Sequence, residues 1–276
     1  MSPAPPPSIP RSPSRSSAAL HTETIGTGPR LVMAHGFTQT GRVWGSMYDD
    51  LAEDHEVVLV DMPGHADSSA VTADLAEGAN LLAAAGGPAA YLGYSMGARF
   101  CLHLALARPA LVDHLVLISG TAGIDDPAER RARRQADEAL ADQLDPPTGT
   151  KTATSVEAFV RRWLEGPLFA GISPEANGLA ERLRNTGPGL ASSLRLAGTG
   201  TQQPLWDRLE ELVMPVLIIT GQHDEKFTAL GQRLAAAIGE NATVVVVAGA
   251  GHAPHLQRPA AVAGVVRRHM ATATRP

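Results

Sequence analysis

A serine flanked by two glycines stands directly after an apolar run, in the segment Gly93-Tyr94-Ser95-Met96-Gly97. The run AAYLGY is typical of a buried strand, and the following MGARFCLHLALA has the period of a helix. A sharp strand-turn-helix connection exposes a serine hydroxyl as a nucleophile, and flanking glycines allow the close backbone approach that the turn needs. The pattern GxSxG alone is common, so the prediction that Ser95 is catalytic depends on this context.

A carboxylate and a histidine follow later strand-like runs in the order that such a serine requires. Asp224 comes after VLIITGQH, and His252 comes after TVVVVAGAG. A serine hydroxyl is hardly ionised at neutral pH, so it needs a histidine to accept its proton and a carboxylate to orient that histidine. We predict that Ser95, Asp224 and His252 are the catalytic residues; the alternative is that the latter two are merely polar turn residues.

The loop after the run RLVMA is expected to supply an oxyanion-hole donor. It contains His35, Gly36 and Phe37, and we predict that the backbone N–H groups of Phe37 and Met96 stabilise a developing oxyanion. His35 is predicted to be a structural hydrogen-bonding residue, and His65 is given no chemical role. The remaining histidines show no metal-ligand spacing, so no metal or organic cofactor is expected.

An arginine lies one helical turn after the serine, so Arg99 and Ser95 can project toward the same side of the helix start. A surface salt bridge, which contributes little stability, is the simpler explanation for such an arginine. The later segment AERRARRQADEALA is rich in arginines, most of which we expect on a solvated helix face, with Arg133 and Asp137 as a candidate ion pair.

Short apolar runs alternate with segments of helical period along the chain, which predicts an α/β fold with a mostly parallel sheet flanked by helices. The candidate residues follow strands, where ligands meet open parallel sheets. Residues 1–18 are Pro/Ser-rich and are predicted to form a disordered tail before a domain of residues 19–276. The charged, alanine-rich stretch of about 121–212 lacks a good strand and is predicted to be an inserted helical cap.

Composition narrows the class of protein further. Among 276 residues, 44% are hydrophobic and 18% charged, and no apolar run is long enough to span a membrane. The formal net charge of -5 argues against a nucleic-acid partner, so an anionic ligand would need a local cluster of cations. The single cysteine, Cys101, excludes an internal disulfide and fits a cytoplasmic protein. The oligomeric state is not indicated.

Several motifs together resemble those of the 2-succinyl-6-hydroxy-2,4-cyclohexadiene-1-carboxylate synthase family, α/β-hydrolase-fold enzymes of menaquinone biosynthesis. The similarity covers nearly everything after the tail. It rests on GYSMGAR, AERRARRQAD, WLEGPLF, LRNTGPGLASSLR, GQHDEKF and AGAGHAPH. Many relatives carry glycine where this chain has Ala66.

The resemblance implies a lyase that eliminates pyruvate from 2-succinyl-5-enolpyruvyl-6-hydroxy-3-cyclohexene-1-carboxylate, with the serine acting as a base. It implies that Arg99, Arg134 and Arg184 bind substrate carboxylates and that Trp163 and Tyr94 shape the pocket. Arginine suits this role because its planar guanidinium holds a carboxylate through two hydrogen bonds. Arg131 is the second choice for the position given to Arg134.

Two other functions are compatible with the same residues. A serine hydrolase would form an acyl intermediate on Ser95 and cleave a carboxylic ester or a carbon-carbon bond of an anionic substrate. A non-catalytic relative would bind a ligand without turnover. The arginines favour the lyase over an ordinary esterase, whose pocket should be mostly apolar, and the complete set of catalytic residues argues against the non-catalytic relative.

Overall fold

The computed structural model describes residues 19–149 and 152–271, so the predicted tail of residues 1–18 lies outside the described residues. A seven-stranded sheet forms the centre of the fold, with the strand order β1-β3-β2-β4-β5-β6-β7. All neighbouring strands are parallel except β1, which pairs antiparallel with β3. The strands are β1 (Thr22–Ile25), β2 (Arg30–Ala34), β3 (Glu56–Val60), β4 (Ala89–Tyr94), β5 (Val112–Ile118), β6 (Val216–Gly221) and β7 (Ala242–Val247).

Six of these strands coincide with the apolar runs of the sequence, which confirms the predicted mostly parallel α/β sheet. Strands β4 and β6 are buried along their whole length, as expected for central strands covered on both faces. Strand β1 was not predicted. It has four residues, TETI, whose exposure alternates along the edge of the sheet, so it lacks an apolar run.

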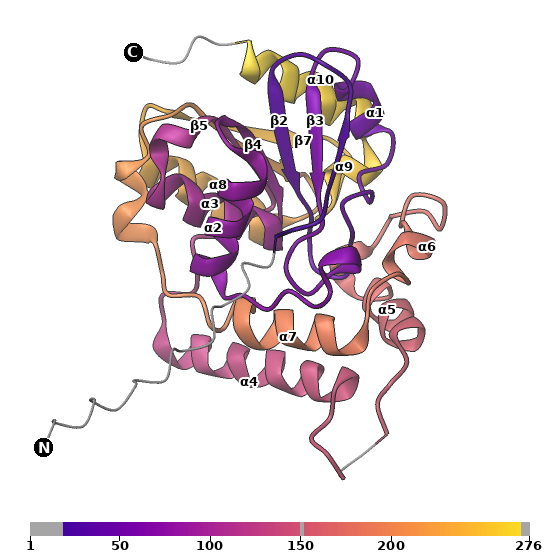
Figure 1. Ribbon diagram of the computed structural model, residues 1–276. Helices are drawn as coiled ribbons and strands as arrows, with labels where there is room; N and C mark the ends of the chain where they lie inside the picture. Colours follow the sequence, from indigo (N-terminus) through magenta and orange to yellow (C-terminus); the bar gives the residue numbers. More distant parts are fainter. Residues whose placement is uncertain (1–18, 150–151, 272–276) are drawn as a thin grey trace, which may run out of the picture.

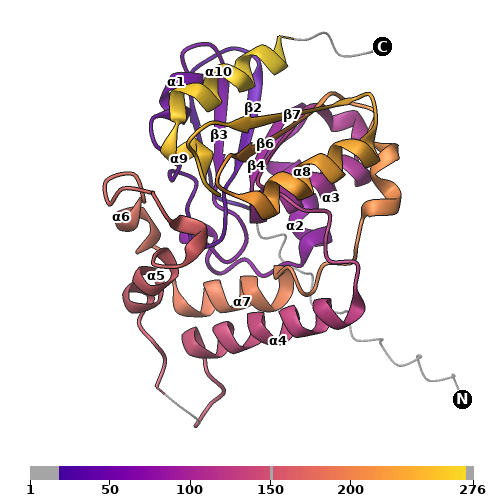
Figure 2. The same cartoon turned by 180° about the vertical axis from the view of Figure 1, so that it is seen from behind.

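Helices cover both faces of the sheet (Figures 1 and 2). One core cluster packs the face that carries α2, α3 and α8, and a second packs the face that carries α1, α9 and α10. None of the described helices is long and apolar enough to cross a membrane. The helices that cover the two faces of the sheet are α1 (Met47–Leu51), α2 (Leu75–Gly86), α3 (Met96–Ala107), α8 (Glu225–Ile238), α9 (Pro254–Gln257) and α10 (Pro259–Met270).

The segment for which the sequence predicts a cap contains helices and, among its described residues, no strand. Helices α4 and α7 lie side by side across one end of the sheet, with α5 and α6 beside them (Figures 1 and 2). Arg195 of α7 pairs with three carboxylates in and just after α4 at 2.7–3.0 Å, which fixes the two helices together. The helices are α4 (Pro127–Leu144), α5 (Val156–Leu164), α6 (Leu179–Arg182) and α7 (Gly187–Ala197).

Short 3-10 helices complete the fold. One of them, η1 (Ala66–Ser68), begins at Ala66, the position at which the sequence departs from the pattern of the resembled family. The others are η2 (Pro109–Leu111), η3 (Pro167–Phe169) and η4 (Trp206–Glu211).

Ala66 has a φ of 40°, in the left-handed region that favours glycine. We expect Ala66→Gly to raise the free energy of unfolding by roughly 0.5–1 kcal/mol, because relief of the left-handed strain exceeds the added entropy of the unfolded chain. The melting temperature should rise by about 2 °C, as measured by thermal unfolding. Ala84→Gly is the matched control, because Ala84 is exposed inside α2 and its substitution should lower stability. Equal losses in both variants would contradict the prediction.

Candidate active site

Ser95 lies on the sharp turn between β4 and α3. Its φ of 49° and ψ of -101° are strained for a residue with a side chain, and its N–H donates to the carbonyl of Ile118 on the adjacent strand at 2.8 Å. A Cβ at Gly97 would lie 1.9 Å from the carbonyl oxygen of Ala34, and one at Gly93 would lie 2.5 Å from the backbone of the first turn of α3. Both glycines are therefore required for the turn that presents the Ser95 hydroxyl.

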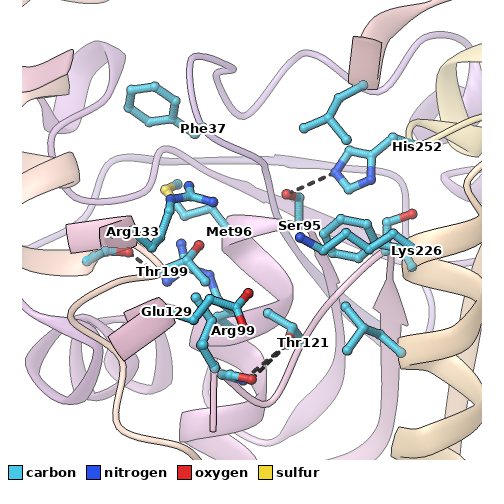
Figure 3. A pocket seen from close by; sticks show the side chains of 18 of the residues that line it. Phe37, Ser95, Met96, Arg99, Thr121, Glu129, Arg133, Thr199, Lys226 and His252 are labelled. Atoms are coloured by element: carbon cyan, nitrogen blue, oxygen red, sulfur yellow. Dashed lines mark hydrogen bonds between the residues drawn. The ribbon is translucent and has the colours of Figure 1, made fainter. Parts of the chain in front are cut away.

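The structure brings Asp224 and His252 to this serine, and Figure 3 shows the His252 ring beside the Ser95 hydroxyl. His252 Nδ1 lies 2.6 Å from Asp224 Oδ2, and His252 Nε2 lies 3.3 Å from Ser95 Oγ. Asp224 also accepts a hydrogen bond from Phe227 N–H at the start of α8, so its carboxylate is fixed in place. With the proton on Nδ1, the free Nε2 can accept the proton of the Ser95 hydroxyl.

Buried histidines hold the loop that follows β2. Met62 N–H donates to His35 Nε2 at 3.0 Å, and Thr38 N–H donates to His65 Nε2 at 3.3 Å. Burial lowers the pKa of His35 to about 4 and that of His65 to about 3, so both rings are neutral acceptors at neutral pH. Phe37, in the same loop, lies at the pocket together with Met96. Because Met96 is the first residue of α3, its N–H has no acceptor within the helix.

A pocket of about 370 Å³ opens beside Ser95. It lies between the carboxyl ends of the strands and the helices α4, α5 and α7, with α8 on a further side. Charged side chains gather in it, which is unusual for a ligand pocket and points to an ionic ligand. The charged residues that line it are Arg99, Asp125, Asp126, Glu129, Arg133, Lys226 and Arg233.

Arg99 is the cation closest in sequence to Ser95, and its side chain reaches the pocket from α3 (Figure 3). Arg99 is only 6% exposed, and Nη1 donates to the carbonyl of Ala197 at 2.7 Å. No carboxylate of the described residues lies within 4.0 Å of it, so it forms no surface salt bridge of the kind that the sequence left open. Burial lowers the pKa of Arg99 to about 10. The guanidinium is therefore still protonated and charged at neutral pH.

On α4 the structure places Arg133, and not Arg134 or Arg131, at the pocket. Arg134 and Arg131 are exposed, whereas Arg133 shares the helical face of Asp126 and Glu129 and pairs with the buried Asp137 at 2.7 Å. The register predicted from the resemblance thus differs from the structure by one residue for Arg134. The apolar residues Ala141 and Leu144 lie on the same helical face, and their spacing is the sequence signal that could have identified it.

Arg184 also does not line the pocket. It pairs with Asp67 at 2.6 Å and Glu181 at 3.0 Å, and its side chain is 37% exposed. Two residues earlier, Arg182 is fully buried, and its guanidinium donates to Thr38 Oγ1 and to the carbonyl of Asn177. Arg182 therefore holds Thr38, which has a φ of 66°, in the loop beside Phe37.

Trp163 and Tyr94 contact the site in different ways. Trp163 lines the pocket and packs edge-on against Phe37, with 5.2 Å between ring centroids. Tyr94 lies beneath the surface at 2% exposure and does not line the pocket. It packs against His252 at 5.6 Å, and its ring approaches Gly36 so closely that a Cβ there would lie 2.7 Å away. Tyr94 thus supports the histidine and the loop.

Only one group of metal-ligand type is present in the described part of the chain, formed by His21, Asp61 and Asp67. Asp67 is already paired with Arg184, and Asp61 accepts hydrogen bonds from the N–H groups of Gly41 and Asp67. His21, Asp61 and Asp67 all lie outside the lining of the pocket.

The chain is similar over most of its length to known proteins of one fold family. The family model described as alpha/beta hydrolase fold matches residues 29–259. The chain is 34% identical to a putative 2-succinyl-6-hydroxy-2,4-cyclohexadiene-1-carboxylate synthase of Bacillus subtilis, over 87% of this chain and 90% of that one. It is 31% identical to a pimeloyl-[acyl-carrier protein] methyl ester esterase of Xanthomonas oryzae, over 92% and 99%. The solved structure of MenH from S. aureus superposes with a TM-score of 0.80 and 26% identity, over 91% and 97%.

Proposed function

Because the chain belongs to the α/β-hydrolase fold family and is similar to its 2-succinyl-6-hydroxy-2,4-cyclohexadiene-1-carboxylate synthases, we propose that it is a lyase of menaquinone biosynthesis. The proposed reaction eliminates pyruvate from 2-succinyl-5-enolpyruvyl-6-hydroxy-3-cyclohexene-1-carboxylate. The observation that carries the proposal is Arg99. A buried guanidinium beside Ser95, with no carboxylate partner among the described residues, suits an acidic substrate.

In the proposed mechanism Ser95, Asp224 and His252 act as a catalytic triad that removes a proton. His252 Nε2 takes the hydroxyl proton of Ser95, and Ser95 Oγ removes a proton from a ring carbon of the substrate. The proton comes from C2: the electron pair of that C–H bond forms C2=C3, the electrons of C3=C4 move to form C4=C5, and the C5–O bond to the enolpyruvyl group breaks. The leaving enolate becomes pyruvate once its carbon is protonated, so atoms and charge balance without a cofactor.

The backbone N–H groups of Phe37 and Met96 are proposed to stabilise the enolate oxygen that develops during this step. Carboxylates of the substrate are proposed to bind Arg99 and, on the opposite helix α4, Arg133. This assignment replaces Arg134 and Arg184, which are exposed outside the pocket. Trp163 remains a proposed pocket wall, and Tyr94 is proposed to position His252.

Ester hydrolysis is the second candidate function, favoured by the similarity to methyl ester esterases at comparable coverage. In that reaction Ser95 Oγ attacks an ester carbonyl, the alcohol leaves, and water releases the acid. The triad geometry serves both reactions, so the lining of the pocket must distinguish them.

The deciding experiment supplies the purified protein with the enolpyruvyl substrate and, separately, with pimelate monomethyl ester and p-nitrophenyl acetate. Pyruvate release, coupled to lactate dehydrogenase, and diene absorbance report elimination, with an enzyme-free sample to subtract the spontaneous reaction. Elimination far above that background, with slow ester cleavage, is the expected result. Elimination at the background rate together with efficient ester cleavage would replace the lyase with a hydrolase.

A further inference from the structure

One further cation, Lys226, lines the pocket and has no ion-pair partner among the described residues. Lys226 is the second residue of α8, two residues after Asp224, and it lines the same pocket as Ser95 and His252. Figure 3 shows its side chain running from α8 into the pocket on the side of these two residues. Sequence reasoning missed Lys226, although its position next to Asp224 at the start of a helix would have placed it near the site.

The composition of the chain makes this lysine distinctive. The sequence contains 21 arginines and two lysines, Lys151 and Lys226, and Lys151 lies outside the described residues. The one described lysine therefore lies in the pocket, in a chain whose basic side chains are nearly all arginines. An ammonium group on a flexible stem is compact and strongly hydrated, which suits an exposed position at a pocket mouth better than a buried one.

The neighbouring cations of the pocket differ from Lys226 in their partners. Arg233, also on α8, pairs with Asp125 at 2.6 Å and stacks over the Trp206 ring at 3.7 Å. Arg133 pairs with Asp137. Within the described residues, no carboxylate lies within 4.0 Å of Lys226. Among the pocket cations, Arg99 and Lys226 are thus the two that have no carboxylate of the described residues within 4.0 Å.

We propose that Lys226 is a specificity-determining residue that binds a second carboxylate of the substrate while Arg99 binds another. Arg99 reaches the pocket from α3 and Lys226 from α8, so a diacid that bridges them occupies the pocket that Ser95 also lines. The pair therefore selects substrates with acid groups at both ends over monoacids and neutral esters. This inference rests on the proposed function, since it assigns the ligand groups of the same pocket.

Steady-state kinetics of Lys226→Met test the assignment. We expect the KM for the enolpyruvyl substrate to rise about tenfold while kcat changes less than threefold, because a charge-assisted hydrogen bond is lost from binding and not from the chemical step. Lys226→Arg should restore most of the affinity, and hydrolysis of p-nitrophenyl acetate by Ser95 should change less than twofold. Arg108→Met is the control for loss of a positive charge, because Arg108 lies at the far end of α3 and bonds Asn80.

An unchanged KM in Lys226→Met would overturn the assignment, as would an equal rise in Arg108→Met. A parallel loss of p-nitrophenyl acetate hydrolysis would instead show that Lys226 supports the fold of the site. Absence of pyruvate release in the unaltered protein would overturn the proposed function, and the binding measurement below would still decide the role of Lys226.

Ligand binding at Lys226 can be observed directly because the chain has so few amines. Reductive methylation with ¹³C-formaldehyde labels the α-amine, Lys151 and Lys226 while keeping their charge, and Lys226→Arg assigns the pocket signal. Titration with glutarate should shift the Lys226 signal at a several-fold lower concentration than titration with butyrate, and Arg99→Met should remove this preference. Equal shifts with both acids, or an equal shift at Lys151, would contradict the two-carboxylate site.

Discussion

Ser95→Ala is expected to lower the catalysed rate of pyruvate release by about 10⁶-fold, the loss typical of removing the reactive member of a catalytic triad. The reason is geometric, because Ser95 Oγ is the group that contacts His252 Nε2 and faces the pocket. The oxyanion donors and the arginines remain, so substrate should still bind with a Kd within a few fold of that of the unaltered protein. Pyruvate release and calorimetric titration with a slowly reacting substrate analogue measure the two quantities.

Ser46→Ala provides the matched serine control. Ser46 is exposed before α1, its side chain makes no cap hydrogen bond, and its loss should leave the rate unchanged. Asp224→Asn should lower the rate by about 10⁴-fold, less than Ser95→Ala, because the amide favours the wrong histidine tautomer. Pyruvate release above one tenth of the unaltered rate in Ser95→Ala would show that another group removes the ring proton.

The catalytic candidates could be read from the sequence because backbone topology places them. Ser95, Asp224 and His252 each follow a parallel strand, and parallel strands end at one edge of a sheet. Their distances of 2.6 and 3.3 Å therefore follow from strand assignments that the apolar runs made clear. The sharp turn with close backbone approach at Ser95 was likewise predicted from Gly93 and Gly97.

The positions of the cap cations were harder to predict because helix rotation decides them. Adjacent residues on α4 point about 100° apart, so a shift of one residue exchanges the pocket position of Arg133 for the exposed position of Arg134. Similarly, α6 ends at Arg182, so the exposure of Arg184 depends on where a four-residue helix stops. The short edge strand β1 was missed for a different reason, because its sequence TETI has little apolar content.

Arg99→Met is expected to change affinity and stability in opposite directions. The KM for the enolpyruvyl substrate should rise by about 10²-fold or more. A desolvated guanidinium binds a carboxylate with a much larger favourable free energy than an exposed guanidinium does. The free protein should become more stable by about 1–2 kcal/mol. Burial lowers the pKa of Arg99 from 12.5 to about 10, which corresponds to a penalty on the order of 3 kcal/mol, and the lost hydrogen bond to Ala197 offsets part of the gain.

The sign of the stability effect follows from protonation. Below pH 10 Arg99 is protonated in both the folded and the unfolded chain, so the penalty for burying its charge is fully present and should not vary between pH 6 and 9. Urea unfolding at pH 6, 7.5 and 9 measures the stability, and pyruvate release measures KM. Arg99→Lys keeps the charge without the planar fork, so it should retain the burial penalty and recover only part of the affinity. A less stable Arg99→Met with an unchanged KM would mean that Arg99 serves the fold through Ala197, with substrate carboxylates bound elsewhere in the pocket.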